Sequence, residues 1–287
     1  MKKKHSAFDA INSTILVLIA LVMLYPFWYV LMGSLMTNAE SMVNPYKLFA
    51  KFPTLEAYKI FFENTSMVSN LLVSTYITLA GAFLGLVFTS MAAYALSRKY
   101  LPGRRTVNKY ITFTMLFSGG MIPYFLVVKA LGLYNKLEAL YIPTLINAYY
   151  LIIMRTNFSS IPDSLEESAK IDGANFFQIF CKIILPMSKP VLATILLFYA
   201  VDHWNDMTSG LLFIMDPKKQ PLQTTLYRIL SNQDSQLTNA GVSLGGQFST
   251  KTLQNAATII TVLPILIVYP LLQKYFVTGV TLGAVKE

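Results

Sequence analysis

The chain has 287 residues, of which 54% are hydrophobic and only 13% are charged, and its mean hydropathy is +0.51. A soluble domain carries about 25% charged residues, so the composition excludes an ordinary soluble protein and predicts a chain that lies partly in lipid. The net charge of +9 does not indicate nucleic-acid binding, because the basic residues stand between apolar segments and form no single patch.

Six apolar stretches are long enough to cross a bilayer, which takes roughly 20 residues at about 1.5 Å per residue. The sequence therefore predicts an all-α, multi-pass membrane protein with six transmembrane helices in a single domain over residues 1–287. In chain order the stretches are about Thr14–Met36, Leu71–Leu96, Val107–Val128, Leu140–Asn157, Lys189–Ile214 and Ala256–Phe276.

The first stretch follows the basic sequence MKKKH, which resembles the start of a signal peptide. Its apolar run is longer than the ~7–15 residues of a signal peptide and no small-x-small cleavage site follows it, so we expect a retained first span. The distribution of Lys and Arg favours cytoplasmic N- and C-termini. In that orientation 14 of the 23 basic residues lie on the inner side, including the cluster RKYLPGRR at Arg98–Arg105.

Two longer loops then lie on the extracellular side, at about residues 37–70 and 215–255. The first contains a short predicted interfacial helix within NPYKLFAKFPTLEAYKIFFEN. The second contains Leu222, Leu226 and Leu230, whose i, i+4, i+8 spacing predicts an amphipathic helix along the membrane interface.

The chain carries no motif for nucleotide hydrolysis, since neither G-x-x-x-x-G-K-[ST] nor another catalytic signature occurs in it. Cys181 is the only cysteine, which excludes an internal disulfide and a cysteine-ligated metal site. We therefore expect no catalytic residue, no metal and no cofactor in this chain. Energy-driven work would need ATP hydrolysis by another polypeptide.

An inner connection at about residues 160–188 contains EESAKIDGANFFQIFCKIILP, which begins polar and turns apolar. Ser164 and Glu167 have the spacing of a capping box, which predicts a helix with Ser164 as its N-cap. Gly173 supplies the left-handed residue that ends this helix, and an apolar helix over Asn175–Leu185 follows. The pattern predicts a helical hairpin on the inner membrane surface.

This hairpin resembles the EAA loop of ABC-importer permeases, whose pattern is Glu-Ala-Ala, three residues, Gly, nine residues and Ile-x-Leu-Pro. The chain has Glu-Ser-Ala at 167–169, Gly173 and Ile-Ile-Leu-Pro at 183–186, with Ser168 in place of the usual first alanine. The resemblance covers nearly the whole chain and is to the carbohydrate-uptake group, in particular the smaller, six-span permease of the maltose-transporter type. The segments FSGGMIP, DHWND and PLQTTLYRIL are similar to permeases of the oligosaccharide or polysaccharide branch.

The resemblance implies a type I ABC-importer permease fold in a bacterial cell membrane. Such a chain is a non-catalytic subunit that passes oligosaccharides or other glycans from an extracellular binding lipoprotein into the cytoplasm. The implied partners include a second, related permease in a heterodimer and two cytoplasmic ATPase subunits, which bind the ATP and Mg. The polar helix of the hairpin would be the coupling helix in an ATPase cleft, with coupling residues Glu166, Glu167, Ser168, Ala169, Asp172 and Gly173.

Two further segments gain a role from the resemblance. The tail VTGVTLGAVKE is similar to a tail that reaches the ATPase dimer. The loop over about Asn232–Gln247 resembles one that inserts toward the docked binding protein, although its residues match less closely.

Asp202 and Asp206 are the only acids within the six predicted spans. Charges at such depth are costly and normally face a bundle interior or a water-filled cavity. Their i, i+4 spacing places them on one helix face, with Tyr199 and Trp204 elsewhere around the helix. A sugar pathway uses aromatic faces together with carboxylates or amides, whereas a structural role would pair the acids with neighbouring helices. The predicted pathway residues are Tyr199, Asp202, His203, Trp204, Asn205, Asp206, Ser118 and Asn147.

Two other functions remain open on the sequence alone. Asp202 and His203 could carry protons in a secondary sugar transporter that acts alone, although the chain shows no paired broken helices in matching halves. The same residues with Asp206 could act as acid and base in a membrane enzyme, although nothing else completes a catalytic site.

Overall fold

The computed structural model describes residues 7–43, 48–231 and 250–284. This part of the chain is helical and contains no β-strand, which confirms the all-α prediction. The chain forms two compact units. Unit 1 comprises Met1–Val68 and Leu226–Pro264, and unit 2 comprises Ser69–Thr225 and Ile265–Glu287.

Three helices are each long and apolar enough to cross a membrane by themselves, at Ile11–Ser34, Ser66–Ser97 and Lys251–Val268. They belong to α1 (Ala7–Ser34), α4 (Thr65–Ser97) and α15 (Thr250–Ala284). None of the apolar window of α1 is buried within this chain. An apolar helix surface that the rest of the chain does not cover requires lipid or another protein around it.

In unit 1, the segment after α1 holds α2 (Asn38–Val43) and α3 (Glu56–Glu63), the short helix predicted for the first extracellular loop. Hydrogen bonds connect this segment to α1. The Trp28 indole donates to the Leu48 carbonyl at 2.8 Å, and the Ser34 and Tyr58 hydroxyls lie 2.6 Å apart.

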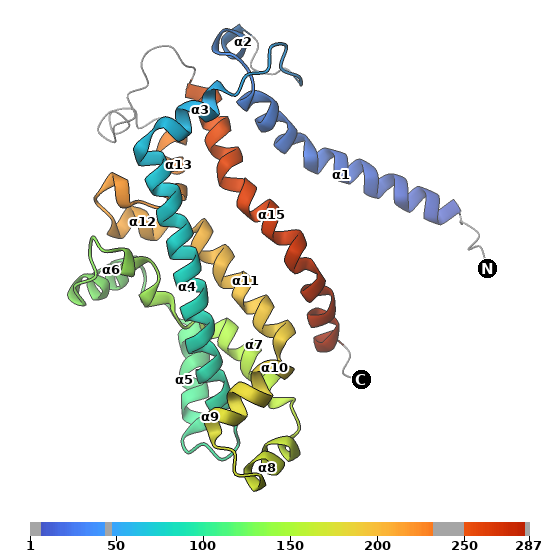
Figure 1. The fold of residues 1–287 in the computed structure, drawn as a ribbon, viewed down its shortest axis with the longest axis vertical. Helices are drawn as coiled ribbons and strands as arrows, with labels where there is room; N and C mark the ends of the chain where they lie inside the picture. The colour runs from blue at the N-terminus through green and yellow to red at the C-terminus, as the bar shows by residue number, and fades with distance from the viewer. Residues whose placement is uncertain (1–6, 44–47, 232–249, 285–287) are drawn as a thin grey trace. The chain divides into compact units, whose positions relative to one another are not determined.

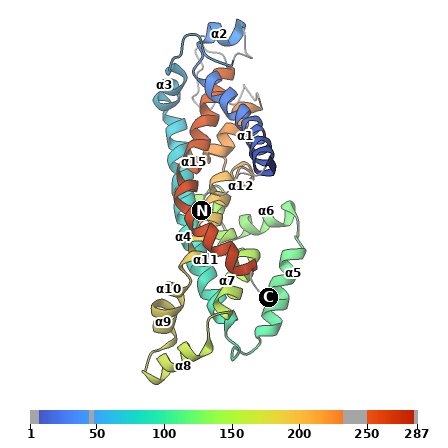
Figure 2. The same ribbon diagram turned by 90° about the vertical axis from the view of Figure 1, so that its right-hand side faces the viewer.

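Bent helix pairs make up the remaining spans. Helices α5 (Arg104–Leu116) and α6 (Met121–Ala130) meet at 120°, and Figure 2 shows α6 turning sharply away from α5. The prediction of one span over 107–128 therefore needs correction. Phe117 is extended and Gly120 has φ of +87°, a value that glycine adopts without steric cost, so the chain turns at FSGG.

The fourth predicted span is also bent. The short helices η1 (Leu137–Leu140) and η2 (Ile142–Thr144) meet α7 (Ala148–Ser159) at 46°. The break stands at Leu145–Asn147, where the Asn147 side chain caps α7 by accepting from the amides of Tyr149 and Tyr150.

The fifth predicted span, Lys189–Ile214, is shorter than predicted. Helix α11 covers Lys189–Asn205 and stops at Asp206, whose backbone is extended and whose carboxylate accepts from the Ser209 amide at 3.0 Å. This bond caps a separate helix, α12 (Thr208–Phe213). Counting each bent pair as one span, the described residues contain up to six spans, as predicted.

The predicted amphipathic helix is α13 (Leu222–Leu230), which follows the turn η4 (Pro217–Lys219). Leu222 and Leu226 are buried as predicted, but Leu230 is half exposed and Ile229 is buried instead. The buried stripe therefore follows a mixed i, i+4, i+7 spacing, as expected for a helix of about 3.6 residues per turn.

Helices α4 and α11 pack closely inside unit 2 through two glycines of α4. A Cβ built on Gly81 would lie 2.5 Å from the His203 imidazole, and one on Gly85 would lie 3.1 Å from the Tyr199 ring. Small residues four apart let two membrane helices approach closely. The core of this unit extends from here through α7 to the hairpin, with Met154, Phe158, Ile179, Ile184 and Ile195 fully buried.

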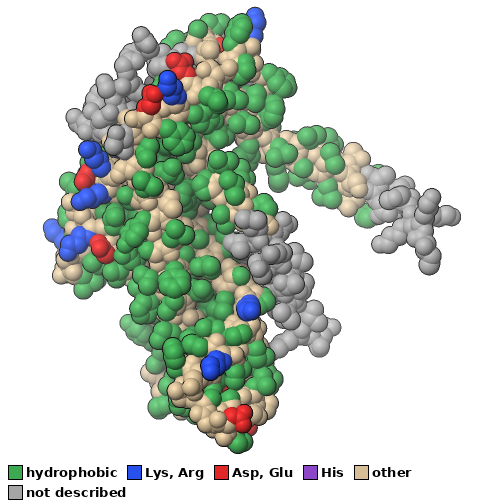
Figure 3. Space-filling model, viewed as in Figure 1, with side chains coloured by type: hydrophobic (Ala, Val, Ile, Leu, Met, Phe, Trp, Pro, Cys, Tyr) green, Lys and Arg blue, Asp and Glu red, His purple; other side chains and the backbone are tan. Residues whose placement is uncertain are grey.

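Hydrophobic side chains cover much of the molecular surface that Figure 3 shows, as expected for a protein in lipid.

Candidate functional site

The coupling hairpin lies beside the C-terminal end of α4 and consists of α8 (Asp163–Ile171), α9 (Phe176–Ile179), the π-helical turn η3 (Phe180–Ile184) and α10 (Leu185–Met187) (Figure 1 and Figure 2). Gly173 ends the polar helix with φ of +80°, so the predicted left-handed bend is confirmed. An 86° bend at Ser188 separates the hairpin from α11.

The predicted capping box at Ser164 and Glu167 is wrong. Helix α8 begins at Asp163, directly after Pro162, so Ser164 lies inside the helix. A capping box instead opens α9. The Asn175 side chain accepts from the Gln178 amide, and the Gln178 side chain accepts from the Asn175 amide, both at 2.9 Å. Each bond satisfies a backbone donor that a helix start leaves unpaired.

The predicted coupling residues divide into two groups. Glu167, Ser168, Asp172 and Gly173 are exposed and Ala169 is half-buried. These residues form an accessible surface over the second half of α8 and the two residues after it, which we call the accessible face of α8. Glu166 points into the molecule and is only 4% exposed. This exposed face has the small residues and charges that the sequence predicted for contact with a partner.

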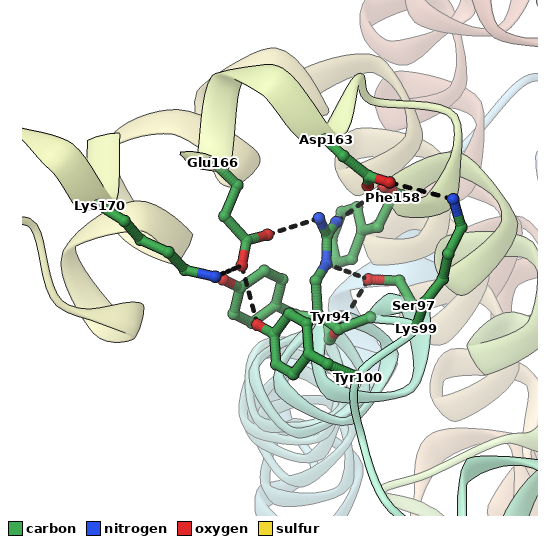
Figure 4. A network of polar contacts seen from close by, with 9 residues as sticks. Tyr94, Ser97, Lys99, Tyr100, Phe158, Asp163, Glu166 and Lys170 are labelled. Atoms are coloured by element: carbon green, nitrogen blue, oxygen red, sulfur yellow. Dashed lines mark hydrogen bonds and ion pairs between the residues drawn. The ribbon is translucent and has the colours of Figure 1, made fainter. Parts of the chain in front are cut away.

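Glu166 is the centre of a hairpin network formed with Arg98, Tyr100 and Lys170 (Figure 4). Its Oε2 accepts from Arg98 Nη1 at 2.6 Å. Its Oε1 accepts from the Tyr100 hydroxyl at 2.8 Å and lies 2.9 Å from Lys170 Nζ. Both carboxylate oxygens therefore have charged or hydroxyl donors, which a buried carboxylate requires.

Arg98 stands just after the last residue of α4 and is 5% exposed. Besides Glu166, it donates from Nη2 to the Phe158 carbonyl at 2.9 Å and from Nε to the Ser97 hydroxyl at 2.9 Å. One planar guanidinium thus joins the end of α4, the last turn of α7 and α8. Lysine could not reproduce this fork.

The protonation of the network is also fixed by these contacts. Burial alone would raise the pKa of Glu166, but hydrogen bonds from Lys170 and Tyr100 and the Arg98 charge together hold it below its ordinary value. Burial and the hydrogen bond to Glu166 raise the pKa of Tyr100. Glu166 is therefore a carboxylate and Tyr100 a neutral hydroxyl donor at neutral pH.

A second ion pair joins the same two segments at the surface. Lys99 Nζ lies 3.0 Å from the Asp163 carboxylate, and the two side chains are 80% and 60% exposed. The hydrogen bond from Lys99 lowers the pKa of Asp163. Exposed pairs of this kind contribute little, because water screens them and two long side chains lose conformational freedom.

Most of the predicted pathway residues line one cavity of about 350 Å³ in unit 2. Six of the eight predicted residues are there, together with two that the sequence did not single out. The lining consists of Thr144, Asn147, Tyr199, Val201, Asp202, His203, Asn205 and Asp206. Ser118 and Trp204 do not line it. Ser118 accepts from the Gly120 amide in the α5–α6 break, and Trp204 is buried.

The prediction that Tyr199 lies on a different helix face from Asp202 and Asp206 is wrong. Tyr199, Asp202 and Asp206 follow the i, i+3, i+7 spacing of one helix face, although Asp206 stands just beyond the end of α11. The Tyr199 hydroxyl accepts from the Asn147 amide at 2.9 Å and lies 2.6 Å from the Thr89 hydroxyl. Tyr199 therefore holds the bend before α7 against α4.

The two acids of the cavity have different partners. Asp202 accepts from the Tyr150 hydroxyl at 2.6 Å, whereas Asp206 caps α12. The His203 Nε2 atom is buried without a hydrogen-bond partner among the described residues. Carboxylates and amides that line one cavity can accept hydrogen bonds from hydroxyl groups and donate to them. In residues 7–43, 48–231 and 250–284, no group of three His, Cys, Asp or Glu side chains could hold a metal.

Sequence reasoning missed Arg98, Tyr100 and the two glycines of α4. Arg98 had been assigned to orientation alone, and nothing in its local sequence tells that it pairs with a residue 68 positions away. Gly81 and Gly85 do carry a signal, because GAFLG is a G-x-x-x-G pattern within an apolar helix. The loop at 232–247 and the last three residues of the tail lie outside the described residues, while α15 continues to Ala284.

Comparison with known proteins decides the family. Residues 10–282 match the family described as binding-protein-dependent transport system inner membrane component. The chain belongs to this family. It is thus a membrane permease component of a transport system, and the predicted resemblance to ABC-importer permeases is confirmed.

Two relatives and one solved structure illustrate the match. The chain is 41% identical over 286 residues to the polygalacturonan/rhamnogalacturonan transport system permease protein YtcP of Bacillus subtilis (strain 168), covering 99% of both chains. It is 41% identical over 284 residues to protein LplC of the same strain, covering 99% of this chain and 96% of that protein.

The solved structure is a crystal structure of a bacterial ABC transporter involved in the import of the acidic polysaccharide alginate. Its matching chain has a TM-score of 0.87 and 32% identity, covering 96% of this permease and 99% of that chain. The permease therefore has the fold of an ABC importer, with spans that are bent as well as straight.

Proposed function

We propose that this permease is one membrane subunit of an ATP-driven importer that carries oligosaccharides or other glycans into the cytoplasm. The observation that carries this proposal is the 0.87 TM-score with a chain of an alginate importer over nearly the full length of both chains. The polygalacturonan/rhamnogalacturonan permease that is 41% identical supports the same class of polymeric, acidic sugar.

The accessible face of α8 is the proposed contact with a separate ATPase. Glu167, Ser168, Asp172 and Gly173 are exposed there, and Ala169 between them is small. A small, charged face lets a partner approach closely and fixes its register. Glu166 takes a different role, because both of its oxygens are bound within this chain.

The cavity of about 350 Å³ described above, which residues of α11 line, is the proposed substrate pathway, and we call it the α11 cavity. Asp202 and His203 line it, and Asn205 and Asp206 stand at its α12 side. Tyr199 and Asn147 line the cavity but act mainly as positioning residues, because their polar atoms hold the bend before α7.

The complete importer would contain four further subunits. These are a second, related permease, two ATPase subunits that bind ATP and Mg, and an extracellular binding lipoprotein, in keeping with the binding-protein-dependent family. The exposed apolar surface of α1 supports a setting in lipid or against the second permease. Both termini and the coupling hairpin lie in the cytoplasm in this proposal.

Reconstitution tests this function directly. The permease, its partner permease, the ATPase and the binding protein are assembled in proteoliposomes, and uptake of labelled oligogalacturonides and alginate oligosaccharides is measured. We expect uptake only with ATP and with every subunit present. Uptake by this chain alone, driven by a proton gradient and abolished by an uncoupler, would refute the proposal in favour of a secondary transporter.

A further inference from the structure

We propose that the hairpin network is the rigid joint that passes movement of the coupling helix to α4, with Arg98 and Glu166 as its positioning residues. This inference rests on the proposed function, since it needs an ATPase that moves α8. It assigns the route by which that movement enters the membrane part of the permease.

The covalent connections between the hairpin and the spans transmit a rotation of α8 poorly, because the helix is broken in both of them. Toward α11 the chain passes through a π-helical turn and then the 86° bend at Ser188, where the backbone is not helical. Toward α7 it passes through the turn at Ser160–Pro162. A bend between two helices absorbs rotation, so neither connection holds α8 at a fixed angle to the spans.

The hairpin network supplies the missing rigid connection. Arg98 binds Glu166 on α8, the Phe158 carbonyl on α7 and its neighbour Ser97 with three different nitrogens. Because the guanidinium is planar and all three bonds are 2.6–2.9 Å long, it cannot rotate without breaking one of them. Movement of Glu166 must therefore carry the end of α4 with it.

Aromatic contacts connect the apolar half of the hairpin to the same end of α4. Lys170 lies over the rings of Tyr100 and Phe176, at 4.7 and 4.9 Å. The Tyr94 ring stacks on Phe180 at 5.2 Å between centroids. Both helical pieces of the hairpin are thus bound to the last turn of α4 and the residues just beyond it.

Helix α4 then leads to the cavity. It is a single unbroken helix from Thr65 to Ser97, and Gly81 on it packs against His203, which lines the cavity. About 16 residues separate Gly81 from the end of α4, or roughly 24 Å of helix. A displacement of the network therefore reaches the cavity wall through one stiff element.

The test compares two ion pairs that join the same segments in the assembled transporter. In the double variant Arg98→Met with Glu166→Met, apolar side chains of similar length replace the buried pair. Lys170 loses its ion-pair partner but is 39% exposed, so no buried charge is left unpaired. In the control Lys99→Met with Asp163→Met, the exposed pair is removed. Uptake of an oligogalacturonide and alginate oligosaccharide mixture and ATP hydrolysis are measured together in proteoliposomes.

We expect the buried-pair variant to assemble with the ATPase and to hydrolyse ATP, but to transport at least tenfold fewer sugars per ATP. We expect the exposed-pair control to stay within twofold of the wild type. Normal coupling in the buried-pair variant would overturn the inference, and so would an equal loss in both variants.

A further variant separates this inference from the proposed function. Glu167→Lys alters the accessible face of α8 but none of the contacts of the hairpin network. If Glu167→Lys abolishes ATPase binding while the buried-pair variant couples normally, only the joint is refuted. If the wild-type permease binds no ATPase, the proposed function itself is refuted.

Discussion

The hairpin network and the α11 cavity differ in how many hydrogen-bond partners their charged side chains have. In the network, both oxygens of Glu166 and three nitrogens of Arg98 have partners within 2.9 Å. In the cavity, the carboxylate of Asp202 accepts a hydrogen bond from only one hydroxyl, that of Tyr150. The difference separates a joint, whose geometry must not change, from a surface that keeps hydrogen-bonding capacity for a ligand.

The same contrast explains which substitutions matter most. Removing one member of a fully paired, buried network leaves the remaining buried charge with only part of its compensation. Removing a cavity side chain with few internal contacts changes what the cavity can bind more than it changes folding.

The largest effect on stability is expected for Arg98→Ala. It leaves Glu166 buried with two of its three donors and costs about 3 kcal/mol, at the low end for a broken buried pair. Thermal unfolding of the purified transporter gives the measurement. Lys99→Ala is the matched control, and its melting temperature stays at the wild-type value because its partner is exposed. Equal losses in the two variants would remove the distinction between the pairs.

Asp202→Asn is expected to lower sugar uptake about tenfold while leaving the melting temperature nearly unchanged. The control is Tyr150→Phe, which removes the internal hydrogen bond to Asp202 but keeps the carboxylate. If Asp202 served only to bind Tyr150, both variants would lose uptake and stability to a similar extent. A larger uptake defect for Asp202→Asn supports a pathway role.

Gly81→Ala is expected to reduce uptake several-fold, and Gly85→Ala to have a smaller effect. An added Cβ at Gly81 meets the His203 ring at 2.5 Å and forces it or the helix to move, whereas at Gly85 the contact with Tyr199 is 3.1 Å. Uptake at equal amounts of inserted protein gives the measurement. The reverse order would show that the spacing between α4 and α11 does not control the cavity.

The smallest effect concerns pH. The pKa of Glu166 lies below its ordinary value of 4.5, so its pairing stabilises the native state above that value. This stabilisation is lost as the pH falls from 4.5 through the lower pKa of the folded protein. The difference in melting temperature between wild type and Glu166→Gln should therefore be constant near neutral pH and shrink below 4.5. A difference that grows in acid would contradict a lowered pKa.

Sequence reasoning was most successful where a local pattern decides the structure. Apolar length predicted the spans at α1, α4 and α15, and Gly173 predicted the bend of the hairpin, because a left-handed residue there favours glycine. The predicted start of α8 was wrong because Asp163 and Ser164 are both residues that helix N-termini favour. In the structure Pro162 is the N-cap and Asp163 is the first residue of α8.

The sequence could not supply what depends on distant residues. The breaks in the spans at Phe117–Gly120 and at Asp206 depend on tertiary contacts and single capping bonds, which hydropathy does not register. The inward direction of Glu166 depends on Arg98, which is far away along the chain. The cavity was predicted in its main residues because acids are rare in apolar spans.

Site-specific crosslinking tests the central claim, that the accessible face of α8 meets the ATPase. Single cysteines are placed at Ser168 and Asp172, with Cys181→Ser to remove the native thiol, and a cysteine at Ser188, which is 1% exposed, serves as the buried control. We expect the first two to crosslink to the ATPase subunit and the control not to. Absence of crosslinks at Ser168 and Asp172, or labelling of these positions from outside the cell, would contradict the account.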